Sequence, residues 1–177
     1  MKLILGGCLA VLLLVAPARA DDHDQRYLTN GYSLLYQLCD QEKPVDMILI
    51  MKTTPKDVAH FLHQVSQSAK DDLDRLDDLR DRDPAIRVDQ TGLCQFELDT
   101  RGSIKDDKQH MLLFGTKDAA FARTLLVSQI EAGTYGMNLA KVLADAEPSP
   151  PRAAALRKIS ASWEKLRDKA YRLLNAQ

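Results

Sequence analysis

The chain has 177 residues, of which 24 are basic and 25 acidic, so its formal net charge is −1. This length is enough for one domain with a hydrophobic core. The balanced charge argues against nucleic-acid binding, which needs a clustered basic face, and equally against a polybasic patch for a membrane surface. After residue 20, no apolar run reaches the length of a membrane-spanning helix, so we expect no integral membrane segment in the mature protein.

The first twenty residues have the form of a secretory signal peptide. A single lysine precedes the apolar run 3–17, and Ala18-Arg19-Ala20 supplies a small-residue cleavage site. We therefore expect a mature protein that begins at Asp21 in the periplasm or outside the cell, with 22 basic against 25 acidic residues. The segment Leu5–Cys8 resembles a lipoprotein cleavage box, but a cut there would leave a leader of only seven residues, so soluble export is favoured.

The spacing of apolar residues is helical through nearly all of the mature chain. We expect residues 21–29 to be a flexible acidic N-terminus and residues 30–177 to form one helical domain. Asn30 is the expected N-cap of a first helix. Pro44 ends that helix and is followed by a short helical piece at 45–52.

The clearest helix start is at Thr54, an N-cap residue followed by Pro55 at the first helical position. Residues 81–94 then break the helical pattern with turn-forming residues, and a third helix is expected over Phe96–Phe114. The helix that starts at Thr54 has a single apolar stripe, made of Val58, Phe61, Leu62, Val65, Ala69, Leu73, Leu76 and Leu79.

A long helix is expected from Asp118 to Ala146, and a final one from residue 149 or 150. The connections between these helices are short, so their flanking helices should be antiparallel neighbours. Gly133 and Gly136 lie inside the long helix, where each costs roughly 1 kcal/mol against alanine, and close helix–helix approach is the favoured compensation. The sequence therefore predicts an all-α protein, an up-down helical bundle of four main helices plus a short N-terminal helical segment.

This pattern resembles a group of exported bacterial helical-bundle proteins of unknown function, which are regarded as ferritin-like. The likeness covers most of the mature chain and implies the fold without any established chemistry. It is carried by Thr91-Gly92-Leu93, Glu97, Arg101, Lys105, Leu112-Leu113, Phe121, Leu125-Leu126, Gln129, Tyr135-Gly136 and Leu139.

Two cysteines remain after removal of the leader, Cys39 and Cys94. In an exported protein an even cysteine count favours a disulfide over two unpaired core residues. Closing the loop of roughly 55 residues between them would stabilise the fold by about 4 kcal/mol on the chain-entropy model. We therefore predict a Cys39–Cys94 disulfide.

A ferritin-like bundle raises the question of a di-iron site, which needs inward-facing Glu-x-x-His pairs. The chain has only Asp57-x-x-His60 and Asp107-x-x-His110, and helical geometry places His60 and His63 on the solvent side. We therefore expect no di-iron centre. The seven aspartates between residues 70 and 83 are interpreted as a solvated helix face, with i,i+4 pairs at Asp71/Arg75 and Asp78/Arg82.

A polar pocket could be lined by Glu97 and Arg101 of one helix and by Gln129 and Glu131 of the next. The favoured alternative is an intrahelical ion pair and a capped core. The sequence contains no catalytic triad order, phosphate-binding loop or HExxH motif, so we identify no catalytic residues.

The one specific site hypothesis concerns the mature N-terminus, Asp21-Asp22-His23. A free amine, two deprotonated amides and the imidazole of a third-position histidine form the square-planar nitrogen set that Cu(II) and Ni(II) favour. The alternative is an unstructured acidic N-terminus. We therefore expect a non-enzymatic binding or accessory protein with an unknown protein partner, and as the alternative a copper- or nickel-handling protein.

Overall fold

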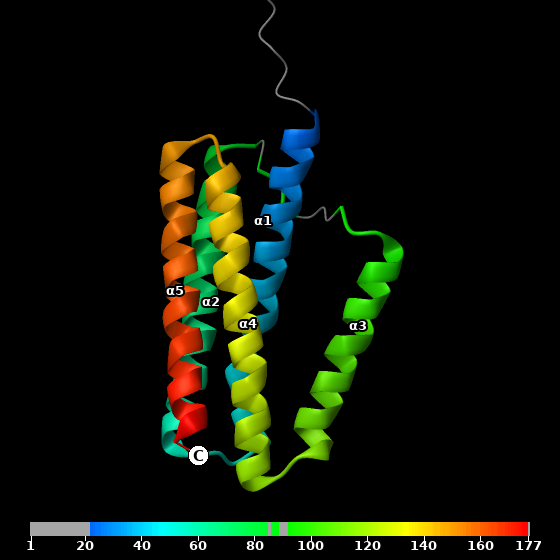
Figure 1. Ribbon diagram of the computed structural model, residues 1–177, viewed down its shortest axis with the longest axis vertical. Helices are drawn as coiled ribbons and strands as arrows, with labels where there is room; N and C mark the ends of the chain where they lie inside the picture. Colours follow the sequence, from blue (N-terminus) through cyan, green and yellow to red (C-terminus); the bar gives the residue numbers. More distant parts are fainter. Residues whose placement is uncertain (1–21, 85, 89–91, 177) are drawn as a thin grey trace, which may run out of the picture.

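The computed structural model describes residues 22–84, 86–88 and 92–176 (Figure 1). Every regular element in these ranges is helical, which confirms the all-α prediction. The elements are α1 (Asp22–Glu42), the 3₁₀ helix η1 (Val45–Ile50), α2 (Lys56–Arg82), α3 (Gln95–His110), the π-helical turn η2 (Met111–Gly115), α4 (Asp118–Ala146) and α5 (Pro150–Asn175).

The first helix is longer than the sequence pattern predicts. It begins at Asp22, so the segment expected to be flexible is helical almost from its start. Asn30 lies within α1 instead of capping it, and its side-chain oxygen accepts a hydrogen bond from the backbone N–H of Gly92. With 21 residues, α1 is a full helix and not the short N-terminal segment we expected.

Four helices lie side by side: α1, α2, α4 and α5 (Figure 1). The most extensive contact is between α4 and α5, which are joined by a three-residue connection. The interior has two core clusters. The first contains Tyr32, Leu35, Cys39, Leu73, Leu76, Ile86, Ala140, Leu143, Ala144, Leu156, Ile159 and Trp163. The second contains Val58, Phe61, Leu62, Val65, Phe121, Leu125, Leu126, Ile130 and Ala170.

The predicted stripe of α2 is confirmed, since its first seven members are buried and the eighth, Leu79, packs against the first core cluster. The predicted helix start is shifted by one residue. Pro55, not Thr54, is the N-cap position, and the hydroxyl of Thr54 has no hydrogen-bond partner. Asp57 instead accepts a hydrogen bond from the N–H of Val58.

The two glycines of α4 lie at its closest contacts, as predicted. A Cβ atom at Gly133 would lie 2.8 Å from Cβ of Arg167, and one at Gly136 would lie 2.8 Å from Trp163 and from Leu38. The buried face of α4 passes through these glycines. Tyr135, which lies between them in sequence, is exposed.

The third helix was predicted to be one of four main helices, but α3 has no buried residue. It runs beside the other helices at a distance and is joined to α4 through η2 (Figure 1). The fourth member of the packed group is α1. The apolar residues of α3 do not repeat on one face, so nothing in this helix matches the continuous apolar stripe of α2.

Candidate functional site

The side of α4 that faces α3 is the most distinctive surface of the molecule. The guanidinium of Arg101 lies 5.8 Å from the ring centre of Tyr135 and donates a hydrogen bond to its hydroxyl at 3.5 Å. One helical turn before Tyr135 in α4, Glu131 forms an ion pair with Lys108 of α3. These links are polar and partly exposed, so they position α3 without burying it.

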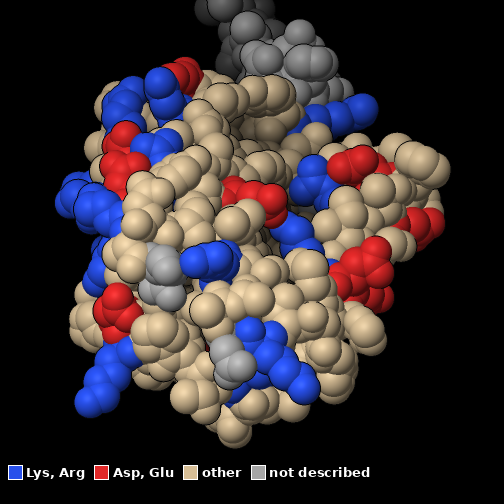
Figure 2. All heavy atoms as spheres, turned by 60° about the horizontal axis from the view of Figure 1, so that its bottom comes forward, with Lys and Arg blue, Asp and Glu red and all other residues tan. Residues whose placement is uncertain are grey.

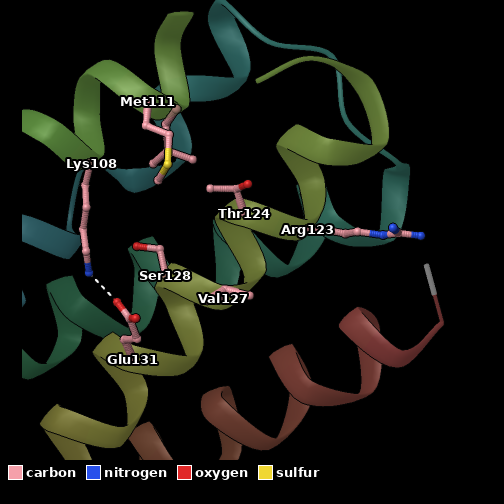
Figure 3. Close-up of a pocket in the computed structure, with 8 residues that line it drawn as sticks. Lys108, Met111, Arg123, Thr124, Val127, Ser128 and Glu131 are labelled. Carbon is pink, nitrogen blue, oxygen red and sulfur yellow. Dashed lines mark hydrogen bonds and ion pairs between the residues drawn. The ribbon is translucent and has the colours of Figure 1, made fainter. Parts of the chain in front are cut away.

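A cavity of about 270 Å³ lies beside these links, between α4 and the end of α3 (Figure 3). Figure 3 shows Lys108 and Glu131 pointing toward one another at one edge, while Arg123 points away. The walls of the cavity are mostly apolar and carry two hydroxyl groups, those of Thr124 and Ser128. The eight lining residues, which include neither histidine nor cysteine, are Lys108, Met111, Leu112, Arg123, Thr124, Val127, Ser128 and Glu131.

The predicted polar pocket is therefore only partly present. Arg101 and Glu97 form the intrahelical ion pair, with 2.8 Å between Nε and Oε1, and Glu131 lines the cavity. Gln129 is buried and faces α1, where its amide donates a 2.9 Å hydrogen bond to Glu42. Burial raises the pKa of the Glu42 carboxyl, while the bond from Gln129 and the charge of Lys108 act in the opposite direction.

The aspartate-rich stretch contains one buried carboxylate that our prediction of a solvated face missed. Asp72 is fully buried, and its Oδ1 accepts a 2.5 Å hydrogen bond from Arg75. Burial raises the pKa of this carboxyl to about 6, although Arg75 acts to lower it. Oδ2 of Asp72 and Nε1 of Trp163 are both buried without a hydrogen-bond partner in the structure. The predicted pair Asp78/Arg82 is present at 3.4 Å.

Sequence spacing held a signal for this residue. Asp72 is three residues after Ala69 and four before Leu76, so it continues the buried stripe of α2. Arg75, which we paired with Asp71, bonds Asp72 instead, while Asp71 accepts a hydrogen bond from Gln67.

A second buried carboxylate joins the helices at the α4–α5 connection. Glu147 accepts hydrogen bonds from the Tyr32 hydroxyl at 2.7 Å, from Arg152 at 2.7 Å and from the N–H of Ser149 at 2.9 Å. Arg152 also bonds Asp83 at the end of α2. Burial alone would raise the pKa of Glu147, but these hydrogen bonds outweigh it and the pKa lies below its usual value. This cluster connects α1, α2 and α5 at one end.

The predicted disulfide is wrong, because both cysteines are free thiols in this structure. Cys39 faces inward from α1 and belongs to the first core cluster. Cys94 is exposed at the N-cap of α3, the helix that lies outside the packed group. Burial raises the pKa of the Cys39 thiol, and the nearby Asp72 and Glu42 raise it further.

The proposed metal site lies outside what the structure describes. Asp21 is not described, and Asp22 and His23 are described only as the first turn of α1. His60 and His63 are exposed, as predicted. The Nδ1 atom of His63 lies 2.8 Å from Asp46. Among the residues with described side chains, no three histidine, cysteine, aspartate or glutamate residues gather as a metal-binding group.

Comparison with known proteins gives no relative: no family model, curated protein or solved structure matches the chain. Within the described ranges, no helix combines the length and the apolar character needed to cross a membrane.

Proposed function

We propose that this chain is an exported, non-enzymatic helical-bundle protein that acts as a binding or accessory protein, with α3 as the element that binds its protein partner. One observation carries this proposal. α3 has 16 residues and no buried side chain, yet Phe96 is 79 % exposed and Ile104 is 50 % exposed.

The energetics of α3 support a binding role. A helix of this length is marginal in water on its own, and burial of a large apolar side chain stabilises a fold by about 1.5–3 kcal/mol. α3 lacks this contribution, and its two exposed polar links to α4 are worth about 0–1 kcal/mol each. A partner that covers Phe96 and Ile104 would supply the missing burial.

In this proposal, α1, α2, α4 and α5 form an up-down bundle that serves as a rigid platform. The short connection at 147–149 and the extensive α4–α5 contact support antiparallel packing. The ferritin-like resemblance enters the proposal for its fold alone. The signal-peptide pattern of the first twenty residues, with expected cleavage after Ala20, supports a location in the periplasm or outside the cell.

Site-specific photocrosslinking in exporting cells tests the α3 proposal. A photoreactive phenylalanine replaces Phe96 in one protein and Val142, an exposed apolar residue of α4, in the control. We expect a defined protein adduct at position 96 only, and we expect Ile104→Glu to reduce it at least fivefold. Identical adducts at both positions, or an adduct at 96 that Ile104→Glu leaves unchanged, would contradict the proposal.

The alternative function is copper or nickel handling by Asp21-Asp22-His23. It rests on the sequence alone, in which a histidine is the third residue after the expected cleavage site and so completes a nitrogen donor set of the kind that these ions favour. A Cu(II) titration of the mature chain tests it. His23→Ala, or one residue added before Asp21, should abolish tight binding, whereas His60→Ala should not.

A further inference from the structure

One end of the molecule brings together three segments that are distant in sequence. η1 and the following loop, η2 and the start of α4, and the last turn of α5 all lie at this end (Figure 1). The ammonium group of Lys52 donates a 3.1 Å hydrogen bond to the carbonyl of Thr116 and so ties the first two segments together. We call this surface the η1 end; it comprises residues 45–57, 111–123 and 170–176.

Large apolar side chains project from the η1 end. Three residues of η1, Val45, Ile48 and Leu49, pack against the second core cluster. This anchoring turns the remaining apolar positions outward, so Ile50 is 81 % and Met51 is 65 % exposed, and Met47 is also exposed. Across the end, Phe114 of η2 is 67 % exposed.

The charges at the η1 end are more basic than the chain as a whole. The five cations Lys52, Lys56, Lys117, Arg123 and Arg172 outnumber the three acids Asp46, Asp57 and Asp118. Figure 2 turns this end forward, and lysine and arginine side chains interrupt an otherwise uncharged surface in the lowest part of the picture. The aspartate-rich part of α2 runs toward the opposite end of the molecule. The balanced composition of the sequence concealed this separation of charge.

We propose that the η1 end binds the surface of an anionic lipid bilayer, with Met47, Ile50, Met51 and Phe114 inserted at the level of the headgroups. Apolar side chains that enter the interface, together with cations beside them, are the two components of peripheral binding to anionic lipid. The charge complementarity selects an anionic bilayer over a neutral one. The four apolar side chains are few beside the roughly 20–30 residues that each partner contributes to a stable protein interface, which disfavours a second copy of the chain.

Vesicle flotation tests this proposal with the chain that starts at Asp21. Residues 22–176 contain both core clusters, so this form holds the whole described fold without the apolar leader. The probes are vesicles of phosphatidylcholine alone and of phosphatidylcholine with 40 % phosphatidylglycerol. We expect binding to the anionic vesicles only, weakened by salt, because a cation near the surface contributes about a fivefold factor in affinity.

Two variants of the η1 end and one control make the test specific. Ile50→Ser/Met51→Ser should lower affinity for anionic vesicles at least tenfold, and Lys117→Glu/Arg123→Glu should lower it by a similar factor. Tyr27→Ser/Val142→Ser, which removes exposed apolar residues from α1 and α4 outside the η1 end, should leave it unchanged. All replaced side chains are exposed, and unchanged circular dichroism would verify the fold.

Several outcomes would overturn the proposal. Equal binding to both vesicle types, or no binding to either, would exclude an anionic bilayer as the ligand of the η1 end. If the η1-end variants bind anionic vesicles as tightly as wild type, the η1 end is not the lipid-binding surface. Self-association without vesicles that Ile50→Ser/Met51→Ser abolishes would show instead that the surface joins two copies. None of these results bears on the role of α3, which lies on the side of the molecule and is tested by crosslinking at Phe96.

Discussion

Gly133 of α4 lies directly against the backbone of Arg167 in α5. A Cβ atom at position 133 would be 2.8 Å from Cβ and 3.1 Å from Cα of Arg167, closer than van der Waals contact allows. Because α4 and α5 share the most extensive contact in the molecule, this approach sets their separation.

The first prediction concerns this contact. Gly133→Ala should destabilise the fold by about 1–3 kcal/mol through overpacking, despite the higher helix propensity of alanine. Gly102→Ala in α3 is the matched control, because a Cβ there meets nothing within 4 Å. The control should gain about 0.5–1 kcal/mol locally, seen as slower hydrogen exchange in α3. Urea unfolding measures the first effect, and an equal or higher stability for Gly133→Ala would refute it.

The second prediction concerns Asp72, whose pKa is raised to about 6 by burial. The folded protein holds this proton more tightly than the unfolded chain, so the carboxyl stabilises the fold below about pH 4 and this contribution is lost as the pH rises to 6. The loss amounts to about 3 kcal/mol at most. The free energy of unfolding of Asp72→Asn, relative to wild type, should therefore increase from pH 4 to pH 7.

Chemical denaturation at four or five pH values measures this difference. Asp71→Asn removes a neighbouring charge from the exposed side of the same helix and serves as the control. A constant difference between Asp72→Asn and wild type across the pH range would show that the buried carboxyl does not titrate there.

The third prediction concerns Glu147, whose pKa is lowered by its hydrogen-bond donors in spite of burial. Its carboxylate stabilises the fold above the unfolded-state pKa, near 4.5, and the contribution is lost as the pH falls through the lower folded-state value. Glu147→Ala leaves Arg152 and Tyr32 without their partner and should cost about 3–5 kcal/mol at pH 7. Tyr32→Phe should cost about 1.5–3 kcal/mol.

Thermal unfolding of Glu147→Ala at pH 7 and pH 3 checks the sign, because its loss of stability relative to wild type should shrink at the lower pH. Glu164→Gln is the control for an exposed acid on α5, with an expected change below about 1 kcal/mol. If the loss of stability is the same at both pH values, the site does not stabilise the charged form of Glu147.

The fourth prediction concerns the two free thiols. Cys94 should react with a maleimide within minutes in the folded protein, whereas Cys39 should react only after unfolding, because it is buried and its thiol pKa is raised. A reducing agent should leave the melting temperature unchanged. A protein that is two mass units lighter and loses stability on reduction would restore the disulfide that the sequence suggested.

The sequence predicted the helices well where burial is continuous. The apolar stripe of α2 and the two close-contact glycines of α4 follow from helical spacing alone, since their period matches the turn of a helix. It failed where the decisive contact is distant. Asn30 has the side chain of an N-cap, but its actual partner, Gly92, is 62 residues away. The isolation of α3 depends on which helices pack together, and periodicity along one helix does not encode that choice.

The candidate sites were likewise predictable where their contacts are local and were missed where they depend on distant residues or on burial. The ion pair of Glu97 and Arg101 was predictable because it is local. Asp72 was misread because its neighbours are exposed aspartates, although its own position continues the buried stripe. The carboxylate of Glu147 gave no signal in the sequence, because the Tyr32 hydroxyl that it bonds is 115 residues away, although Ser149 and Arg152 follow it closely in the chain.

The hydrogen bond between Tyr32 and Glu147 joins residues 115 positions apart, and Trp163 completes the same core cluster. α1, which is synthesised first, therefore cannot complete its contacts in this core until α5 has been synthesised. Such non-local closure slows folding. The N-terminal part of this core is therefore completed only by residues from the C-terminal part of the chain.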